Sequence, residues 1–417
     1  MKRTVVLVLA FLMLVVVVPL FAGGDPENGA VFIDNGGTFI MHNGTVSGNI
    51  GYDRGVVVHN GTFTMENGTI LGNTSGGVST SDNGTFIMEG GTISNNTGRG
   101  VSNGGTFTMK GGVISGNAGG GVYNSGIFTM QDNASVSKNT TNNNGSGVYV
   151  DGGTFSMQNN ASVTSNTVSS DDPDGGGIYV KSGTFTIQDS ASVSGNTAGW
   201  GGGVFVKDGT FTMKGGSVSS NTATFSGGGV YNSRTFIMQD SASMSGNTAY
   251  WGGAVYIDDN GTFTKTGGTI SGDDAEQNLK NTAISGKGFA VYENKNKGWR
   301  NASAGPTANT GSYGFWLNEE AVATGFPPSF IGVWKRSRFN NTLAFTTTMA
   351  KSSSRDVTWK FISASGDTYT FEANTAAKTR LTLTVKYIDG GYWPGHLEIS
   401  GDSGSGENNW NGDWYKQ

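Results

Sequence analysis

The hydrophobic residues of this chain recur in short alternating segments rather than in long runs. The segment Gly-Thr-Phe-Thr-Met, with close variants, repeats every 21 to 30 residues. Residues two apart on a strand share a face, so each Phe and Met should point inward while the Thr hydroxyls point outward. The repeated Phe residues are Phe39, Phe63, Phe86, Phe107, Phe128, Phe155, Phe185, Phe211, Phe236 and Phe263.

A second strand follows each Phe at a fixed distance of seven or eight residues, and a third, typified by Gly-Gly-Val-Tyr, precedes the next Phe. Almost all variation in repeat length lies in the connection between the second and third strands. Two fixed corners and one variable corner per repeat are what a solenoid of parallel coils requires. The pattern therefore predicts an all-β parallel β-helix with three strands per coil and about ten coils, which would extend about 45 to 50 Å.

Two further columns run through the repeats. Met41 to Met238 accompany the Phe column, and Lys265 takes the equivalent position in the tenth repeat, where an inward charge is costly unless the stack is ending. An Asn also recurs after the second strand; Asn tolerates a left-handed turn, and stacked amides can hydrogen-bond from coil to coil. These ladder residues are Asn49, Asn73, Asn96, Asn117, Asn139, Asn166, Asn196, Asn221 and Asn247.

The N-terminus differs from the repeats. Lys2 and Arg3 precede an unbroken apolar run, and Ala22 is a suitable last residue before cleavage, so residues 1–22 are predicted to be a secretory signal peptide. No other stretch could span a membrane as a helix. We therefore expect an exported protein, located outside the cell or on its outer surface.

The C-terminal part also has a different texture. The solenoid, with an irregular last coil, is expected over residues 23–318, and period-two alternation over residues 327–417 predicts a small antiparallel β domain. The Gly-x-Trp opening at Gly332 and the closing Trp-rich strand resemble short lipocalin-like domains of bacterial exported proteins. About 90 residues is short for a complete eight-stranded lipocalin barrel, so ligand storage is not expected.

The repeats themselves carry a second resemblance. Their Gly-Gly-Val-Tyr starts and Ile-Ser-Gly-Asn ends, from about Gly36 to Tyr292, resemble those of bacterial polymorphic outer-membrane and adhesin-type β-helix proteins. The resemblance implies a right-handed β-helix and an adhesive or recognition role at the cell surface. A glycan or a host or surface protein would then be the partner.

Composition narrows the remaining choices. The net charge is only −5 and like charges do not cluster, so no nucleic-acid partner is expected. The chain has no Cys, which excludes disulfides, thiolate metal sites and a Cys nucleophile. No phosphate-loop, dinucleotide or Ser-His-Asp signature occurs, so no cofactor is expected.

The strongest candidates for binding are aromatic. Four of them precede the Gly-Gly start of successive third strands, where exposed aromatic clusters suit sugar rings or a protein partner; folding onto the outer face is the equally weighted alternative. These are Trp200, Phe225, Tyr250 and Trp251. A second column lies one residue after the inward Val of the third strand, facing outward, and could form the floor beneath the variable loops. It comprises Tyr123, Tyr149, Tyr179, Phe205, Tyr231 and Tyr256.

Weaker candidates concern catalysis and metal binding. Glu66 and Glu89 each lie three residues after a Phe, and stacking would hold them near 5 Å, as in a retaining glycosidase, although their column otherwise reads as a solvated turn. Asp171, Asp172 and Asp174 could bind Ca²⁺, but a solvated acidic loop is favoured. A polysaccharide-active enzyme and a purely structural surface protein thus remain alternatives to recognition.

Overall fold

The computed structural model describes the chain in two compact units, within Met1–Thr310 and Gly311–Gln417. In the first unit the described residues are 30–50, 54–81, 83–169, 174–295 and 298–304, and in the second the backbone of eight strands between Gly332 and Lys416. The predicted signal peptide lies outside the described residues. Within these ranges, no helix is long and apolar enough to cross a membrane.

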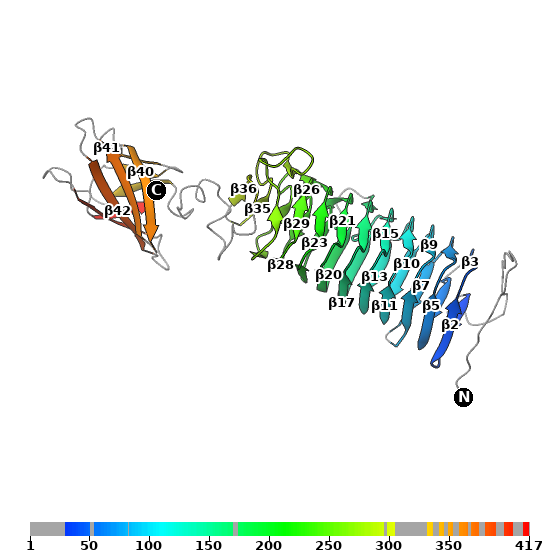
Figure 1. The fold of residues 1–417 in the computed structure, drawn as a ribbon. Helices are drawn as coiled ribbons and strands as arrows, with labels where there is room; N and C mark the ends of the chain where they lie inside the picture. The colour runs from blue at the N-terminus through cyan, green and yellow to red at the C-terminus, as the bar shows by residue number, and fades with distance from the viewer. Residues whose placement is uncertain are drawn as a thin grey trace. The chain divides into compact units, whose positions relative to one another are not determined.

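The first unit is a solenoid of parallel strands (Figure 1). Its largest sheet has 20 strands and contains both the third strand of each coil and the Phe strand that follows it. The third strands are β1 (Val31–Ile33), β4 (Val56–Val58), β7 (Gly76–Thr80), β10 (Arg99–Asn103), β13 (Val122–Asn124), β23 (Val204–Val206), β27 (Val230–Asn232), β31 (Val255–Ile257) and β35 (Val291–Glu293). The Phe strands are β2 (Gly37–Met41), β5 (Gly61–Met65), β8 (Thr85–Met88), β11 (Thr106–Met109), β14 (Ile127–Met130), β24 (Thr210–Met213), β28 (Thr235–Met238) and β32 (Thr262–Lys265). In two coils they merge into the single strands β17 (Val148–Met157) and β20 (Ile178–Ile187).

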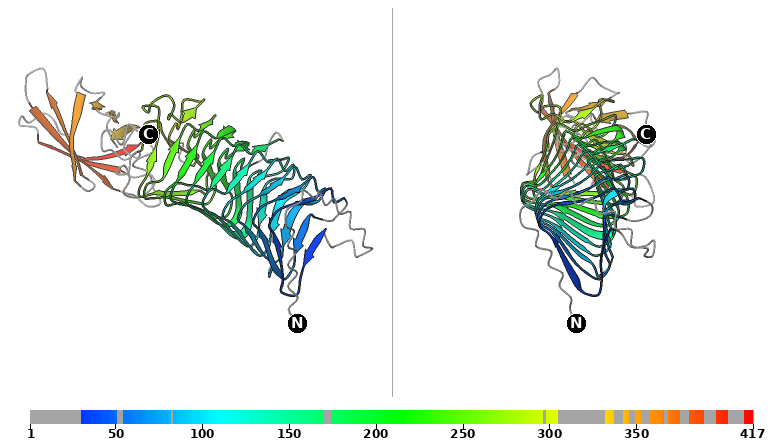
Figure 2. Two further views of the ribbon diagram at one scale, coloured as in Figure 1. Left: turned by 45° about the vertical axis from the view of Figure 1, so that its right-hand side comes forward. Right: turned by 90° about the vertical axis from the view of Figure 1, so that its right-hand side faces the viewer.

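The second strands form a separate sheet of ten, which agrees with the ten predicted repeats. They are β3 (Thr45–Ser47), β6 (Thr69–Leu71), β9 (Thr92–Ser94), β12 (Val113–Ser115), β15 (Ser135–Ser137), β18 (Ser162–Thr164), β21 (Ser192–Ser194), β25 (Ser217–Ser219), β29 (Ser243–Ser245) and β33 (Thr269–Ile270). Seen close to the solenoid axis, successive coils superpose, as the right-hand view of Figure 2 shows. The predicted fold class is confirmed.

The variable corner holds a third sheet that the sequence did not reveal. From the fifth coil onward the connection itself pairs from coil to coil, which makes a sheet of six strands. They are β16 (Thr140–Thr141), β19 (Thr167–Val168), β22 (Thr197–Trp200), β26 (Thr222–Ser226), β30 (Thr248–Ala249) and β34 (Thr282–Ala283). In the later coils this corner is therefore a regular β-sheet, whereas in the earlier coils it is a short bend.

The Phe column forms the core. Phe107 pairs in register with Phe86 on one side and Phe128 on the other, with ring centroids 4.6 Å apart in both cases. The eight rings from Phe63 to Phe236 are fully buried, as predicted from the alternation. Each buried ring contributes on the order of 1.5–3 kcal/mol, so the column is a major source of stability.

The Asn ladder is present and fully satisfied. Asn166 donates its Nδ2 hydrogens to Asn196 Oδ1 at 3.0 Å and to the carbonyl oxygen of Val136 at 3.1 Å. Its own Oδ1 accepts from the backbone N–H and from Nδ2 of Asn139, both at 3.0 Å. The amide therefore uses both donors and both lone pairs. The same pattern continues to Asn281, a member that the sequence analysis missed.

The expectation that the ladder Asn itself takes the left-handed turn is wrong. The residue immediately before it has the positive φ angle at all nine predicted ladder positions: Gly48, Gly72, Asn95, Gly116, Lys138, Ser165, Gly195, Ser220 and Gly246. Because the turn is completed one residue earlier, the ladder amide is directed into the solenoid, where its neighbours in the stack can reach it.

The C-terminal end of the solenoid is covered by a strand that reverses direction. Strand β36 (Gly298–Arg300) pairs antiparallel with β35, and Ala304 bridges back to Ile270. Lys265 ends the Met column as predicted and is only 4% exposed. Burial, together with the charge of Arg300, lowers the pKa of Lys265 to about 8.

The second unit is a closed antiparallel barrel of eight strands. They are β37 (Gly332–Arg336), β38 (Thr342–Phe345), β39 (Met349–Ser352), β40 (Thr358–Ser365), β41 (Thr368–Asn374), β42 (Arg380–Ile388), β43 (His396–Asp402) and β44 (Gly412–Lys416). The antiparallel β domain is confirmed, but the expectation that the segment is too short for eight strands is wrong. Strands of four to nine residues suffice to close it.

The ladder predicts a large and specific loss of stability in Asn166→Ala. The substitution removes the acceptor of two Asn139 donors and the donor to Asn196, leaving buried polar groups unpaired, so the free energy of unfolding should fall by about 3 kcal/mol. Urea denaturation measures it. Ser162→Ala, on the outer face of the same coil, is the control and should change stability by less than about 0.5 kcal/mol; equal effects would contradict the ladder's role.

Because Lys265 is buried, we expect the free energy of unfolding to rise with pH in the alkaline range. The folded chain loses this proton near pH 8, whereas an unfolded lysine keeps it to about pH 10.4, so the cost of burying the charge fades between those values. The unfolding free energy of wild type relative to Lys265→Met should therefore increase by about 1–2 kcal/mol from about pH 7 to pH 9.5. Lys214→Met, at an exposed lysine, should show no such change, and parallel pH profiles for wild type and Lys265→Met would refute the assignment.

Candidate binding surface

Four aromatic side chains gather on the six-stranded sheet of the variable corner. Trp200 ends β22, Phe225 lies in β26, and Tyr250 and Trp251 follow β30. We call these four residues the aromatic patch. The rings of Trp200 and Phe225 lie 5.0 Å apart, and those of Tyr250 and Trp251 lie 4.6 Å apart and perpendicular.

Three members of the aromatic patch are exposed to solvent. The exposed fractions are 36% for Phe225, 43% for Tyr250 and 38% for Trp251, whereas Trp200 is half-buried. A backbone hydrogen bond of 3.1 Å from Trp251 to the Phe225 carbonyl ties the two neighbouring coils together. The predicted juxtaposition of loop aromatics is thus present, and the side chains are only partly folded onto the protein. Their role in binding stays a prediction.

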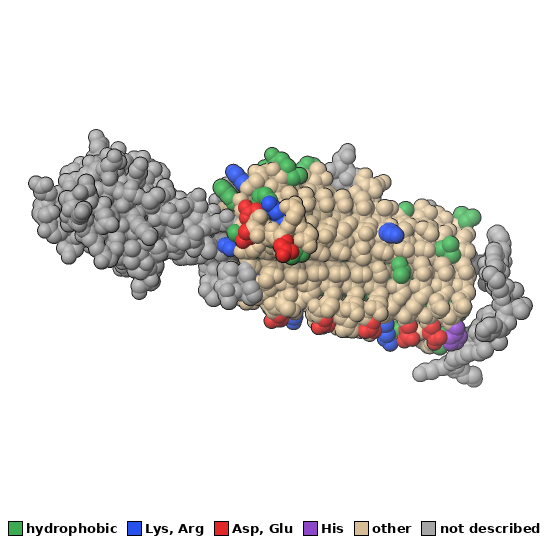
Figure 3. Space-filling view, turned by 45° about the horizontal axis from the view of Figure 1, so that its top comes forward, with side chains coloured by type: hydrophobic (Ala, Val, Ile, Leu, Met, Phe, Trp, Pro, Cys, Tyr) green, Lys and Arg blue, Asp and Glu red, His purple; other side chains and the backbone are tan. Residues whose placement is uncertain are grey.

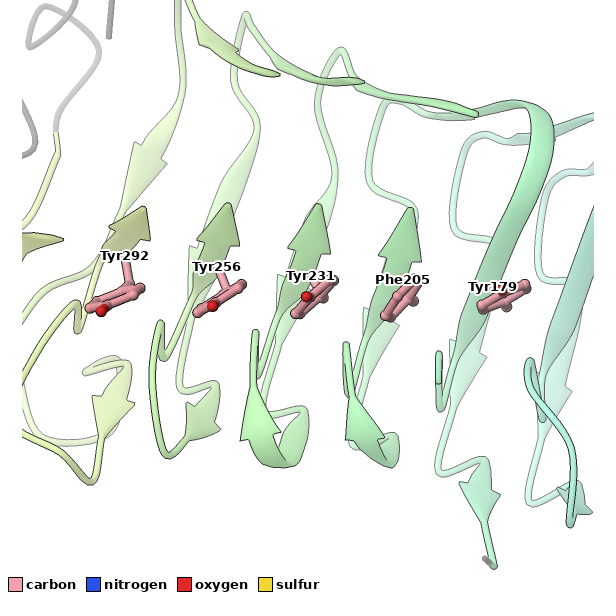
Figure 4. Close-up of a cluster of buried hydrophobic side chains, with 5 residues drawn as sticks. All are labelled: Tyr179, Phe205, Tyr231, Tyr256 and Tyr292. Atoms are coloured by element: carbon pink, nitrogen blue, oxygen red, sulfur yellow. The ribbon is translucent and has the colours of Figure 1, made fainter. Parts of the chain in front are cut away.

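Beneath the loops runs the second predicted set of aromatics, which we call the aromatic column. Figure 4 shows five of its rings in one row, each on the next coil. Tyr179, Phe205, Tyr231 and Tyr256 are less than 10% exposed, and the column extends to Tyr292, which the sequence analysis did not include. Ring centroids of Phe205 and Tyr231 are 4.6 Å apart and nearly parallel.

The aromatic column is therefore a packed floor rather than an open surface over most of its length. Trp200 packs edge-on against Tyr231 at 5.5 Å, so the patch stands directly on this floor. Burial raises the pKa of Tyr179 to about 12, and burial likewise raises the pKa values of Tyr231 and Tyr256. Only Tyr123 and Tyr149, at the N-terminal end of the column, remain half-exposed.

Residues 28–198 match the family model described as a right handed beta helix region. This segment is a right-handed β-helix. The in-register pairing of the matched coils continues beyond them to β35, so the later coils share the same architecture. No curated protein and no solved structure matches the chain. The finer resemblances, to adhesin-type proteins and to lipocalins, stay predictions.

Figure 3 shows a row of charged side chains along one edge of the β-helix. The candidate catalytic pair can be placed by the pairing of the strands that precede it. Glu66 and Glu89 follow strands paired in register, so they lie on adjacent coils as expected. Each carboxylate is engaged separately: Glu66 pairs with His42 at 2.6 Å and Glu89 with Lys110 at 3.1 Å. All four side chains are solvent-exposed, and contacts of this kind at a protein surface contribute little to stability.

The acidic loop is described only in part. Asp171 and Asp172 lie outside the described residues, and Asp174 exchanges hydrogen bonds with Asn144, at 3.0 Å to its backbone N–H and 3.3 Å to its carboxylate. Among the described residues, no three His, Cys, Asp or Glu side chains come together as a metal site would require.

Two arginines near the N-terminal end of the aromatic column were not singled out from the sequence. Arg99 lies over the ring of Tyr123, with Cζ 4.3 Å from the centroid. Arg54 Nη1 is buried and has no hydrogen-bond partner. The signal was available: both arginines stand two residues before the inward Val of a third strand, where most coils of the β-helix carry Gly.

Truncating a side chain should lower the free energy of unfolding more in the buried aromatic column than in the exposed aromatic patch. Tyr231→Ala removes a buried ring that contacts three other aromatics and should lower the free energy of unfolding by about 3 kcal/mol. Tyr250→Ala, in the exposed patch, should change it by less than about 1 kcal/mol. Urea denaturation of both variants makes the comparison, and a larger loss in Tyr250→Ala would reverse the assignment of floor and patch.

Proposed function

We propose that this protein is an exported recognition module whose aromatic patch binds a partner at or outside the cell surface, and that the bound groups are sugar rings. The carrying observation is the exposure of Phe225, Tyr250 and Trp251 on consecutive coils of a rigid scaffold. Clustered aromatic side chains that remain exposed to solvent are a common feature of binding sites. The apolar N-terminal run supports the export part of the proposal.

The size of the patch favours a glycan over a protein. With fractional exposures near 40%, the three exposed side chains of the patch offer roughly 250 Å². A stable protein interface takes about 800 Å² from each partner. A few sugar rings need far less area, and the Gly- and Thr-rich strands around the patch offer the hydrogen-bonding groups that sugar hydroxyls require.

The scaffold also suits recognition. Trp200 packs against Tyr231 and Trp251 lies against Tyr292, so each ring pair of the patch rests on the buried column and little conformational entropy remains to be lost when a ligand binds. The backbone beneath is tied by hydrogen bonds from coil to coil, which fixes the spacing between neighbouring aromatic side chains.

A glycan array and a panel of host-matrix proteins, probed with residues 23–417, test the proposal. The double variant Phe225→Ala/Trp251→Ala should lose at least tenfold in affinity for whichever glycans the wild type binds, because both removed rings are exposed contact surface rather than core. The direct measurement is calorimetric titration with the strongest glycan from the array.

Phe32→Ala supplies the matched control, since Phe32 is a comparably exposed aromatic (43%) in the first coil, far along the chain from the patch. It should bind like the wild type. Binding to matrix proteins alone, or glycan binding that survives in the double variant, would refute sugar recognition by the aromatic patch.

A further inference from the structure

The chain contains a second, basic feature at the same corner of the β-helix. Val56 and Val101 both pair with Val78, so the residues two positions earlier, Arg54 and Arg99, stand in one row with a coil between them. The intervening residue is Gly76, which has no side chain to fill the space. At strand spacing, the Cα atoms of the two arginines are about 10 Å apart, within reach of one small ligand held between their side chains.

The charges in this row are not neutralised by the ion pairs of the described residues, none of which includes Arg54 or Arg99. Burial and the nearby charge of Arg99 both lower the pKa of Arg54, so the two guanidinium groups repel one another. Two like charges held together, one of them partly buried, form a costly arrangement unless an anion joins them.

Two buried polar atoms of these coils have no hydrogen-bond partner. Arg54 Nη1 and Ser102 Oγ are both shut off from solvent without a hydrogen-bond partner. Ser102 lies in β10, three residues after Arg99, and pairs in register with Tyr123, over whose ring Arg99 is stacked. Arg99 itself is exposed, so a ligand can approach it from solvent.

We propose that Arg54, Arg99 and Ser102 bind a single oxyanion, a carboxylate or sulfate group of an acidic sugar. Guanidinium groups and a hydroxyl are the donors that recognise such groups, and arginine binds them through two parallel hydrogen bonds. The choice of a sugar as carrier rests on the proposed function, whereas the oxyanion site stands without it. Tyr123 and Tyr149, stacked on each other beside the site, are half-exposed, so the sugar ring that carries the acid group can contact their edges.

Other groups along this face limit how much negative charge the ligand carries. Asp151 accepts hydrogen bonds from Tyr123 at 3.1 Å and from Lys181 at 3.0 Å, so it is already engaged. Asp174 follows further along the corner, toward the aromatic patch. A glycan with one or a few acid groups fits this pattern better than a uniformly charged polymer.

Calorimetric titration of residues 23–417 with oligosaccharides of equal length, one ending in a uronic acid, one sulfated and one neutral, tests the site. An acidic ligand should bind at least tenfold more tightly than the neutral one, and the two acidic ligands distinguish carboxylate from sulfate. Arg54→Gln and Arg99→Gln should each abolish that preference. Lys214→Gln removes an exposed lysine directly after β24 and should leave the preference unchanged.

A second readout does not depend on sugar binding. Sulfate should raise the melting temperature of the wild type above that seen in chloride of equal ionic strength, and the Arg54→Gln/Arg99→Gln variant should lose this difference. If Phe225→Ala/Trp251→Ala loses glycan binding but keeps the sulfate response, patch and oxyanion site are separate. An equal sulfate response in wild type and arginine variant, or an acid preference that survives both single substitutions, overturns the proposal.

Discussion

Everything in the first unit depends on identical groups meeting at the spacing of adjacent strands. The Asn ladder shows the constraint most clearly, because each amide donates one hydrogen to the next amide and one to a carbonyl oxygen of the preceding coil, and it accepts two hydrogen bonds from the preceding Asn. Removing one amide from the interior of this row would leave buried donors and acceptors of its neighbours unpaired. The same spacing brings the Phe rings to contact distance, so polar and apolar columns impose one common register.

This constraint leaves one corner of each coil free. The two corners on either side of the Phe strand have nearly constant length, because a longer connection there would shift every column out of register. Beyond the ladder Asn, the third corner carries no continuous column in the early coils, and its length varies. At this corner the later coils add a sheet, the aromatic patch is exposed, and two arginines replace the usual Gly. The rigid columns thus support a surface whose sequence can vary from coil to coil.

The sequence predicted the columns well and their surroundings less well. Phe107 or Asn166 could be assigned because each recurs at a fixed distance from its neighbours and alternation decides which way it points. Alternation could not decide that Tyr231 is buried, since this depends on how the loop carrying Trp200 folds back over it. The left-handed residue before each ladder Asn was missed because Gly, Asn, Ser and Lys share that position, and the pattern is one of backbone rather than side chain. Arg54 and Arg99 could not be assigned from the repeat, because each replaces the Gly that most coils carry at that position and therefore belongs to no column.

The uniform face that every coil presents to its neighbours has a consequence for how this protein can evolve. A gene duplication that adds one whole repeat creates no new kind of interface, since the inserted coil finds the same Phe ring and the same amide above and below it. The distance between two surfaces of the β-helix can therefore change in steps of one coil. Gain or loss of one repeat between Arg99 and Trp200 would move the basic and aromatic surfaces apart or together by about 4.8 Å, without disturbing either.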